Sequence, residues 1–219
     1  MAAIATEFDV YIHELLTVRR AAGEAAPADL TTRLLTERIA YRYLTDTQIV
    51  SILRLWTVGE LSTISASVSI LAHYLAAHQE IQRDLRANRA SLPVAIDEIL
   101  RIHSPLISNR RITTTDVELG GRELAAGDRI TLMWTSANRD EAVFGDPDEF
   151  RLDRDPSANL LYGAGIHVCP GAPMARLELL VLMEELLDRT TGIGLVPGTE
   201  PTKAVYPASG FTWLPLRIS

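Results

Sequence analysis

The only cysteine of the chain, Cys169, lies in a glycine-rich segment whose residue types suit a metal ligand. The segment, which runs from Tyr162 to Gly171, reads YGAGIHVCPG and leads directly into an apolar stretch with helical periodicity. A thiolate near the start of a helix is stabilised by unpaired backbone N–H groups and by the positive end of the helix dipole. We therefore expect Cys169 to bind a metal through a thiolate sulfur.

The glycines around this cysteine indicate that the metal belongs to a large cofactor. Gly163, Gly165 and Gly171 remove side chains from the loop, so a flat cofactor can lie against the backbone. His167 stands two residues before the sulfur, and its ring N–H groups can donate to a negatively charged edge of the cofactor. The segment therefore predicts a cofactor-binding loop.

Other chemistries fit the segment less well. A single cysteine in an intracellular protein is usually a buried, inert thiol, which is the simplest alternative for Cys169. A dinucleotide loop that starts at Gly163 and Gly165 would need its third glycine at position 168, which is Val168. Zinc would need paired ligands, and the five histidines are dispersed. A nucleophilic pair of His167 and Cys169 stays open, although no orienting third group is recognisable.

The segment resembles the cysteine loop of the cytochrome P450 superfamily, whose pattern is an aromatic residue, Gly, x, Gly, x, His or Arg, x, Cys, x, Gly. Only the aromatic residue differs, because Tyr162 stands for the usual Phe. The resemblance implies haem b (iron protoporphyrin IX), with Cys169 as the proximal iron ligand and His167 beside a propionate. Thiolate ligation favours O–O cleavage by the iron. It also implies that the haem contacts Tyr162, Gly163, Gly165 and Gly171.

A long helix is predicted from Thr47 to His78, and apolar residues cover almost all of its faces, so we expect it to be enclosed by protein. It resembles the central helix that crosses the distal haem face in the same superfamily. The resemblance places Gly59 beside the haem and Ser62 at the usual Thr position, and Ser62 and Glu60 become the catalytic candidates. Leu61 stands where the superfamily has an acid, and Glu60 lies one residue early, about 100° around the helix. Alternatively, the Ser62 hydroxyl only bonds back to the helix.

A second helix, which starts at Pro93, carries Glu98 and Arg101 three residues apart on one face. Pairs of this spacing are commonly surface ion pairs of small energetic value. Here the pair matches the Glu-x-x-Arg motif of the superfamily, which forms a structural triad with an arginine of a later loop. Arg154 is the matching arginine, and we expect the triad to be buried and to support folding.

Residues 111–119 and 128–135 are rich in β-branched side chains and predict a small antiparallel sheet. In the superfamily the first arginine of this sheet meets a haem propionate, and Arg111 occupies that position. Arg110 is the alternative, and a solvated arginine at a strand end is the simplest interpretation of either. The resemblance also places Phe211, in an expected terminal hairpin over residues 206–219, and the segment 105–108 near the substrate.

Composition limits the partners and the compartment. The net charge is −7 without a basic cluster, which argues against nucleic acid or an anionic membrane. Arg54, Glu60 and five serines and threonines between Thr57 and Ser67 make the long helix too polar for a bilayer core. The first residues lack a signal-peptide pattern. One cysteine also excludes an internal disulfide framework. We therefore expect a cytoplasmic protein that meets small apolar molecules.

The resemblance covers nearly the whole chain and implies a fold class, a domain organisation and a reaction. The fold is mainly α with small antiparallel β-sheets, and residues 1–219 form a single truncated cytochrome P450 domain that lacks the N-terminal half of the fold. The implied activity is a haem-thiolate monooxygenase that oxidises a small apolar organic substrate with O2. A ferredoxin- or flavodoxin-type protein supplies the electrons, and a separate chain can supply the missing half in trans. The alternative is a non-catalytic haem-binding protein or a degenerate remnant of a monooxygenase.

Overall fold

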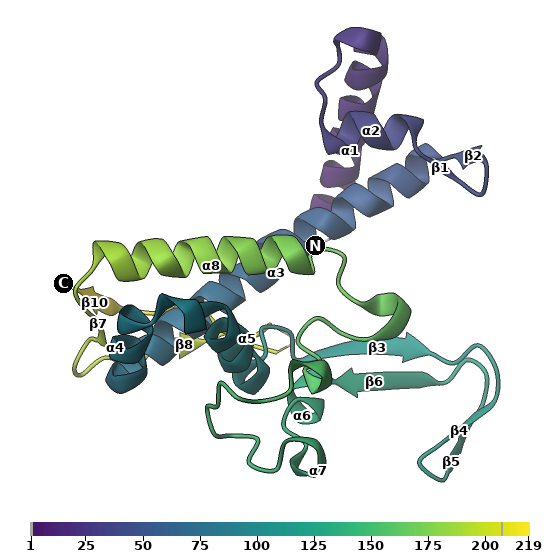
Figure 1. Ribbon diagram of the computed structural model, residues 1–219. Helices are drawn as coiled ribbons and strands as arrows, with labels where there is room; N and C mark the ends of the chain where they lie inside the picture. Colours follow the sequence, from purple (N-terminus) through teal and green to yellow (C-terminus); the bar gives the residue numbers. More distant parts are fainter. Residues whose placement is uncertain (1, 207) are drawn as a thin grey trace. The chain divides into compact units, whose positions relative to one another are not determined.

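The computed structural model describes residues 2–206 and 208–219, and within them the chain is mainly helical with small antiparallel sheets (Figure 1), which confirms the predicted fold class. The Cα positions divide into two compact units, Met1–Leu61 and Ser62–Ser219, and each is described by itself. The predicted terminal segment, residues 206–219, contains Pro207, which lies outside the described residues.

The first unit is a small helical cluster that includes the beginning of the longest helix. In chain order its elements are α1 (Ala2–Ala22), the 3-10 turn η1 (Gly23–Ala25), α2 (Leu30–Thr36), β1 (Arg38–Ile39), β2 (Arg42–Tyr43) and the first half of α3 (Asp46–Ala77). Strands β1 and β2 pair as an antiparallel hairpin. The core of the unit consists of the buried side chains of Ile12, Leu16, Leu34, Leu44, Ile49 and Val50.

Helix α3 begins with a capping box. The backbone N–H of Thr45 donates to Gln48 Oε1 at 2.9 Å, and the N–H of Gln48 donates back to Thr45 Oγ1 at 3.3 Å. These bonds satisfy backbone donors that the helix leaves unpaired at its start. The helix extends over Asp46–Ala77 and thus matches the predicted range, residues 47–78, to within one residue at each end.

The middle turns of α3 are exposed, which corrects the expectation that protein encloses the whole helix. The side chains of Leu55, Val58 and Leu61 are 74%, 57% and 70% exposed. By length and composition α3 is also apolar enough to cross a membrane. The expectation that Arg54 and Glu60 make the helix too polar for a bilayer is therefore not met. The apolar composition of these turns is therefore not explained by burial within the first unit.

In the second unit, the last turns of α3 pack with α5 (Leu92–His103) and α8 (Ala172–Arg189) around one apolar core. Helix α8 contributes Leu179, Met183 and Leu187, which are four residues apart and so form one buried stripe. Leu71 and Leu75 of α3 belong to the same core, together with Ile96, Ile99 and Leu100 of α5. The shorter elements are α4 (Gln79–Ala87), η2 (Arg89–Ser91), α6 (Trp134–Ala137), α7 (Glu141–Phe144), η3 (Pro156–Ala158) and η4 (Gly165–His167).

The predicted sheet is present as two antiparallel pairs. Strand β3 (Ser108–Ile112) lies beside β6 (Arg129–Met133), with Arg111 opposite Ile130 (Figure 1). Strands β4 (Val117–Leu119) and β5 (Arg122–Leu124) form a hairpin around two glycines. The expected continuous strand over residues 111–119 is therefore broken after residue 112.

The terminal segment does not fold back on itself as expected. Strand β9 (Phe211–Trp213) pairs with β8 (Thr202–Lys203), whereas β10 (Leu216–Ile218) pairs with β7 (Ile193–Leu195). The prediction of a hairpin within residues 206–219 is wrong because each of its two strands has an earlier segment as its partner. Such pairing is non-local, and the alternation of the tail contains no information about the partner strand.

Candidate functional site

The loop around Cys169 is closed by backbone hydrogen bonds. The N–H of Cys169 donates to the carbonyl of Tyr162 at 2.8 Å, and residues 165–167 form the single 3-10 turn η4 inside the loop. The N–H of Ala172 donates to the carbonyl of Cys169 at 3.2 Å, where the chain turns into α8. The N-cap of α8 is Gly171, so Cys169 lies two residues before the N-cap rather than at the start of the helix.

Gly163 determines the shape of this loop. Its φ is +77°, and a Cβ there would lie 3.1 Å from the carbonyl oxygen of His167. A side chain would therefore meet both backbone strain and a close backbone neighbour. Gly171 is less constrained, because its Cβ would make an ordinary contact with Cys169 Sγ at 3.8 Å.

The sulfur and its apolar neighbours are exposed. Cys169 is exposed, and the flanking side chains of Ile166 and Val168 are 96% and 51% exposed. This exposure contradicts the alternative of a buried, inert thiol. A soft donor on the same exposed loop as two apolar side chains and several glycines fits a flat, largely apolar metal cofactor.

A metal held by protein side chains alone fits less well. Across the described ranges, no group of three or more His, Cys, Asp or Glu side chains is arranged to hold a metal ion. The exposed Cys169 would therefore suit an iron whose other ligands come with the cofactor, as in a porphyrin. His167 is also exposed on the same loop.

A cluster that was not predicted joins Tyr162 of the loop to Arg176 of α8 and Asp97 of α5. The guanidinium of Arg176, one turn into α8, lies 4.4 Å from the centre of the Tyr162 ring and forms an ion pair with Asp97 at 3.0 Å. Tyr162 Oη and Asp97 Oδ1 are buried and have no hydrogen-bond partner among the described residues. Burial raises the pKa of Tyr162 to about 12, and the charge of Asp97 adds to this shift. Only the adjacency of Asp97 to Glu98 in the sequence could have drawn attention to it.

The candidates for proton delivery are close together on α3. Gly59 is exposed and Glu60 is half-buried in the first unit, whereas Ser62 is exposed at the start of the second unit, which also contains Cys169. Leu61, which occupies the position of the expected acid, is 70% exposed. The structure thus confirms only their position on one helix, and their catalytic roles stay predictions.

The candidate propionate ligands lie on the second unit. Arg111, on β3, is half-buried, and its Nη1 donates to the carbonyl of Arg110 at 2.9 Å. No carboxylate of the described residues lies within ion-pair distance of Arg111. Both Arg111 and the exposed His167 are therefore available to an anionic group, and Arg110 stays an alternative.

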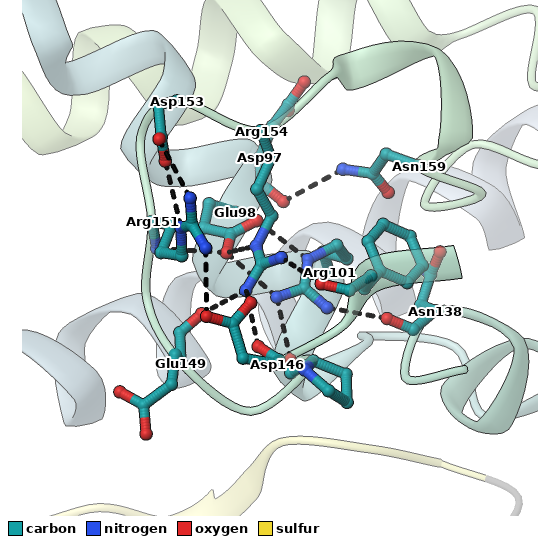
Figure 2. Close-up of polar contacts among 12 residues, drawn as sticks. Asp97, Glu98, Arg101, Asn138, Asp146, Glu149, Arg151, Asp153, Arg154 and Asn159 are labelled. Carbon is teal, nitrogen blue, oxygen red and sulfur yellow. Dashed lines mark hydrogen bonds and ion pairs between the residues drawn. The ribbon is translucent and has the colours of Figure 1, made fainter. Parts of the chain in front are cut away.

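Glu98 lies between Arg101 and Arg154, and these are the three residues that the sequence analysis grouped (Figure 2). Arg101 Nε donates to Glu98 Oε2 at 2.8 Å, and Arg154 Nε donates to Glu98 Oε1 at 2.9 Å. The side chains of Glu98, Arg101 and Arg154 are only 5%, 1% and 10% exposed. The expected ion-pair geometry is thus present, whereas the role of the triad in folding is not tested by geometry.

The two arginines also tie the triad to the loop between α6 and residue 154. Arg101 donates to the carbonyls of Asn138 and Pro147 at 2.7 and 2.8 Å (Figure 2). Arg154 donates to the carbonyl of Phe144 at 2.7 Å and to Asp146 Oδ1 at 2.8 Å. Burial alone would raise the pKa of Glu98, but the hydrogen bonds from its neighbours outweigh burial and hold the pKa below its ordinary value.

Comparison with known proteins finds relatives over nearly the whole chain. The family model described as cytochrome P450 matches residues 2–204. Cytochrome P450 109 of Bacillus spizizenii is 34% identical over 211 residues, which are 95% of this chain and 51% of that protein. The steroid C26-monooxygenase of Mycolicibacterium smegmatis is 37% identical over 185 residues, which are 84% of this chain and 45% of that protein.

Solved structures show the same likeness. The structure of CYP109E1 from Bacillus megaterium in complex with testosterone has a TM-score of 0.88 and 30% identity, and the match covers 97% of this chain and 59% of that chain. A post-tailoring hydroxylase involved in himastatin biosynthesis has a TM-score of 0.90 and 30% identity, with coverage of 100% and 59%. The chain therefore spans about half the length of the relatives it matches.

Proposed function

Because this chain belongs to the cytochrome P450 family, whose members bind haem b, we propose that Cys169 is the axial ligand of a haem iron in a monooxygenase. The chain corresponds to the C-terminal half of the family fold. The observation that carries the proposal is the exposed Cys169 sulfur in a loop closed on Tyr162 and shaped by Gly163. We further propose that residues 1–219 act as one domain, although the Cα positions divide into two units.

The residues of the loop and of β3 are suited to hold the cofactor. Gly163, Gly165 and Gly171 leave backbone without side chains for the porphyrin face, and Gly59 does the same on α3. The side chains of His167 and Arg111 would donate hydrogen bonds to the propionates, which are anionic at neutral pH. When bound, the haem supplies the activation of O2, which no amino-acid side chain can perform.

Proton delivery is assigned to Ser62 and Glu60. The Ser62 hydroxyl can donate and accept a hydrogen bond, and a carboxylate such as Glu60 can take up and release a proton. Leu61 can do neither, so we propose that Glu60 replaces the acid that the family has one residue later. Ser62 is exposed and Glu60 is half-buried, so water can reach both side chains.

The substrate, the electron donor and the compartment follow from the relatives and the composition. One relative is named steroid C26-monooxygenase, and the similar CYP109E1 structure is a complex with testosterone, which supports a small apolar substrate. The net charge of −7 argues against an anionic membrane as a partner, and we propose a cytoplasmic protein. We also propose that a ferredoxin- or flavodoxin-type donor supplies the electrons. We propose that turnover also needs the N-terminal half of the family fold.

A visible spectrum of the reduced carbon-monoxide complex tests the proposal. The unsubstituted chain should show the red-shifted band that a thiolate ligand gives, and Cys169→Ala should lose it. Cys169→Ser is the matched control for shape, because an oxygen donor keeps the size of the side chain while changing its softness. A red-shifted band that persists in Cys169→Ala contradicts the assignment of the ligand.

The same measurement separates the alternatives. A haem band without turnover, even with a reductase and an N-terminal half present, would favour a non-catalytic haem-binding protein. A purified chain that takes up no haem would favour a degenerate remnant. The match of the family model to residues 2–204 supports neither alternative over the monooxygenase.

A further inference from the structure

The hairpin of β8 and β9 is seated on one face of α3. At Gly210, just before β9, an added Cβ would lie 2.6 Å from Ser69 Oγ and 3.0 Å from Ala66 Cα. The backbone of the hairpin therefore touches the helix directly, with no room for a side chain. The N–H of Phe211 then donates to Ser69 Oγ at 3.2 Å, which fixes the register of this contact.

One turn further along α3, the ring of His73 stacks on the ring of Phe211. The ring centres are 4.5 Å apart and the rings are inclined by 30°. Ala66, Ser69 and His73 lie three and four residues apart, so they form one ridge of the helix that faces the hairpin. His73 is half-buried at the end of this ridge.

The other side of the hairpin meets the segment that leads into β3. Leu106 and Ala208 form an antiparallel bridge, and the hydroxyls of Ser108 and Tyr206 lie 3.0 Å apart. The hairpin thus connects α3 with residues 105–108, which the family resemblance leads us to expect near the substrate. A change in the position of Phe211 would therefore alter the contacts of residues 105–108, where the substrate is expected to bind.

The groups around His73 are cationic or become so when they are protonated. They are Lys203 on β8, His78 directly after α3 and His103 at the end of α5. Burial lowers the pKa of His73, and the charges of Lys203 and His78 lower it further. The neutral ring of His73 holds the hairpin by stacking on Phe211. A protonated ring is instead repelled by Lys203, which lies on β8 of the same hairpin.

We propose that His73 is a positioning residue that holds Phe211 and the β8–β9 hairpin on α3 while its ring is neutral, and that protonation of His73 releases the hairpin. The contacts themselves do not depend on haem, whereas the consequence for substrate rests on the proposed function. Below the ordinary pKa of histidine the pocket wall would loosen, and at neutral pH it would be held.

Amide hydrogen exchange of the Phe211 N–H reports directly on its hydrogen bond to Ser69 Oγ, which holds the hairpin on α3. After correction for the intrinsic rate, protection of this amide should be present at pH 8 and lost as the pH falls towards 5. His73→Phe keeps a stacked ring without a titrating group, so protection should persist over the whole range. His73→Asn removes the stack, so protection should be low at both ends.

A control variant and two contradicting outcomes complete the experiment. His13→Asn changes an exposed histidine of α1 in the first unit and should reproduce the unsubstituted chain. Loss of protection at low pH in His73→Phe would overturn the proposal and assign the effect to His78 or His103. Full protection of His73→Asn at pH 8 would show that stacking does not hold the hairpin. Because the readout needs neither haem nor turnover, its failure is distinct from failure of the spectrum of Cys169.

Discussion

At the residue scale, the hydroxyl of Tyr162 distinguishes this chain from the usual pattern of the cysteine loop. Its Oη is buried without a hydrogen-bond partner among the described residues, as is Oδ1 of Asp97. An unpaired buried hydroxyl costs free energy because it loses its water and gains nothing in return. Arg176 compensates in part, since its guanidinium lies over the Tyr162 ring and pairs with Asp97.

We therefore expect Tyr162→Phe to stabilise the chain. The substitution keeps the ring under Arg176 and removes the unpaired hydroxyl, so the free energy of unfolding should rise by about 1 kcal/mol. Urea denaturation followed by circular dichroism measures the change. Tyr41→Phe is the control, because Tyr41 is 97% exposed and its substitution should have little effect. A loss of stability in Tyr162→Phe would mean that water or another group satisfies the hydroxyl.

Gly210 is the residue on which the seat of the β8–β9 hairpin depends. Gly210→Ala introduces a Cβ that would lie 2.6 Å from Ser69 Oγ, at a position where φ is +79°. We expect a loss of about 1–3 kcal/mol of stability, because well-packed contacts tolerate added methyl groups poorly. Thermal unfolding monitors this loss.

Gly198→Ala separates the clash from backbone strain. Gly198 has a similar φ of +74°, but nothing lies within 4 Å of its added Cβ. The alanine variant at position 198 should therefore show only the cost of the left-handed conformation. Equal losses in the two variants would show that the contact with α3 contributes nothing to stability.

At the scale of elements, the triad joins α5 to the loop between α6 and residue 154. Glu98 accepts hydrogen bonds from Arg101, Arg154 and the backbone N–H of Arg151, the last at 3.2 Å (Figure 2). Glu98→Gln leaves the buried guanidinium of Arg101 without its counter-charge and removes one of the two carboxylates that pair with Arg154, so we expect a loss of about 3–5 kcal/mol. Glu149→Gln is the matched control, because that side chain is exposed and lies on the same loop. Similar losses in both variants would contradict a special role for Glu98.

The same carboxylate predicts a pH dependence. Because the pKa of Glu98 is lowered in the folded chain, its contribution to stability is complete above the ordinary pKa of glutamate. The contribution is lost as the pH falls through the lower, folded pKa. Stability curves of the unsubstituted chain and of Glu98→Gln should therefore converge in acid, and parallel curves would contradict this account.

The elements that the sequence predicts well are those with local signals. The range of α3 follows from Thr45, its capping box and a sustained apolar pattern, and the stripe of α8 follows from its helical period. The break after Ile112 and the partners of β9 and β10 were missed, because strand pairing joins segments distant in sequence. The stacking of His73 on Phe211 was missed for the same reason.

The candidate site shows the same division. The ion pairs of the triad were predictable from the Glu-x-x-Arg motif, and the role of Cys169 stays a prediction from its loop motif. The ion pair of Asp97 with Arg176, in contrast, depends on two helices that meet only in the fold. Burial was predicted least well along α3, since an apolar pattern does not say which protein surface covers it. Leu61 illustrates this, with 70% of its side chain exposed.

At the scale of the whole molecule, the proposed proton delivery is the step that most needs the rest of the fold. The chain spans about half the length of the relatives it matches, and α3 carries Glu60, Leu61 and Ser62 as consecutive residues. Enclosure of this helix would exclude bulk water, so the remaining proton donors would have to come from the protein itself. A leucine at the position of the acid should then slow protonation and waste electrons.

Coupling between electrons and product tests this reasoning when an N-terminal half from a close relative is joined to the chain. Product formed per reducing equivalent should rise in Leu61→Glu, and the rate of product formation should rise by on the order of 10²-fold, since a positioned general acid contributes at least that much. Glu60→Ala should lower coupling, because Glu60 is the only carboxylate between residues 47 and 79. Leu61→Gln is the control, since it has a similar size and polarity to Glu without a titrating proton. If Leu61→Glu and Glu60→Ala both leave coupling unchanged, protons reach the haem by a route that does not involve this part of α3.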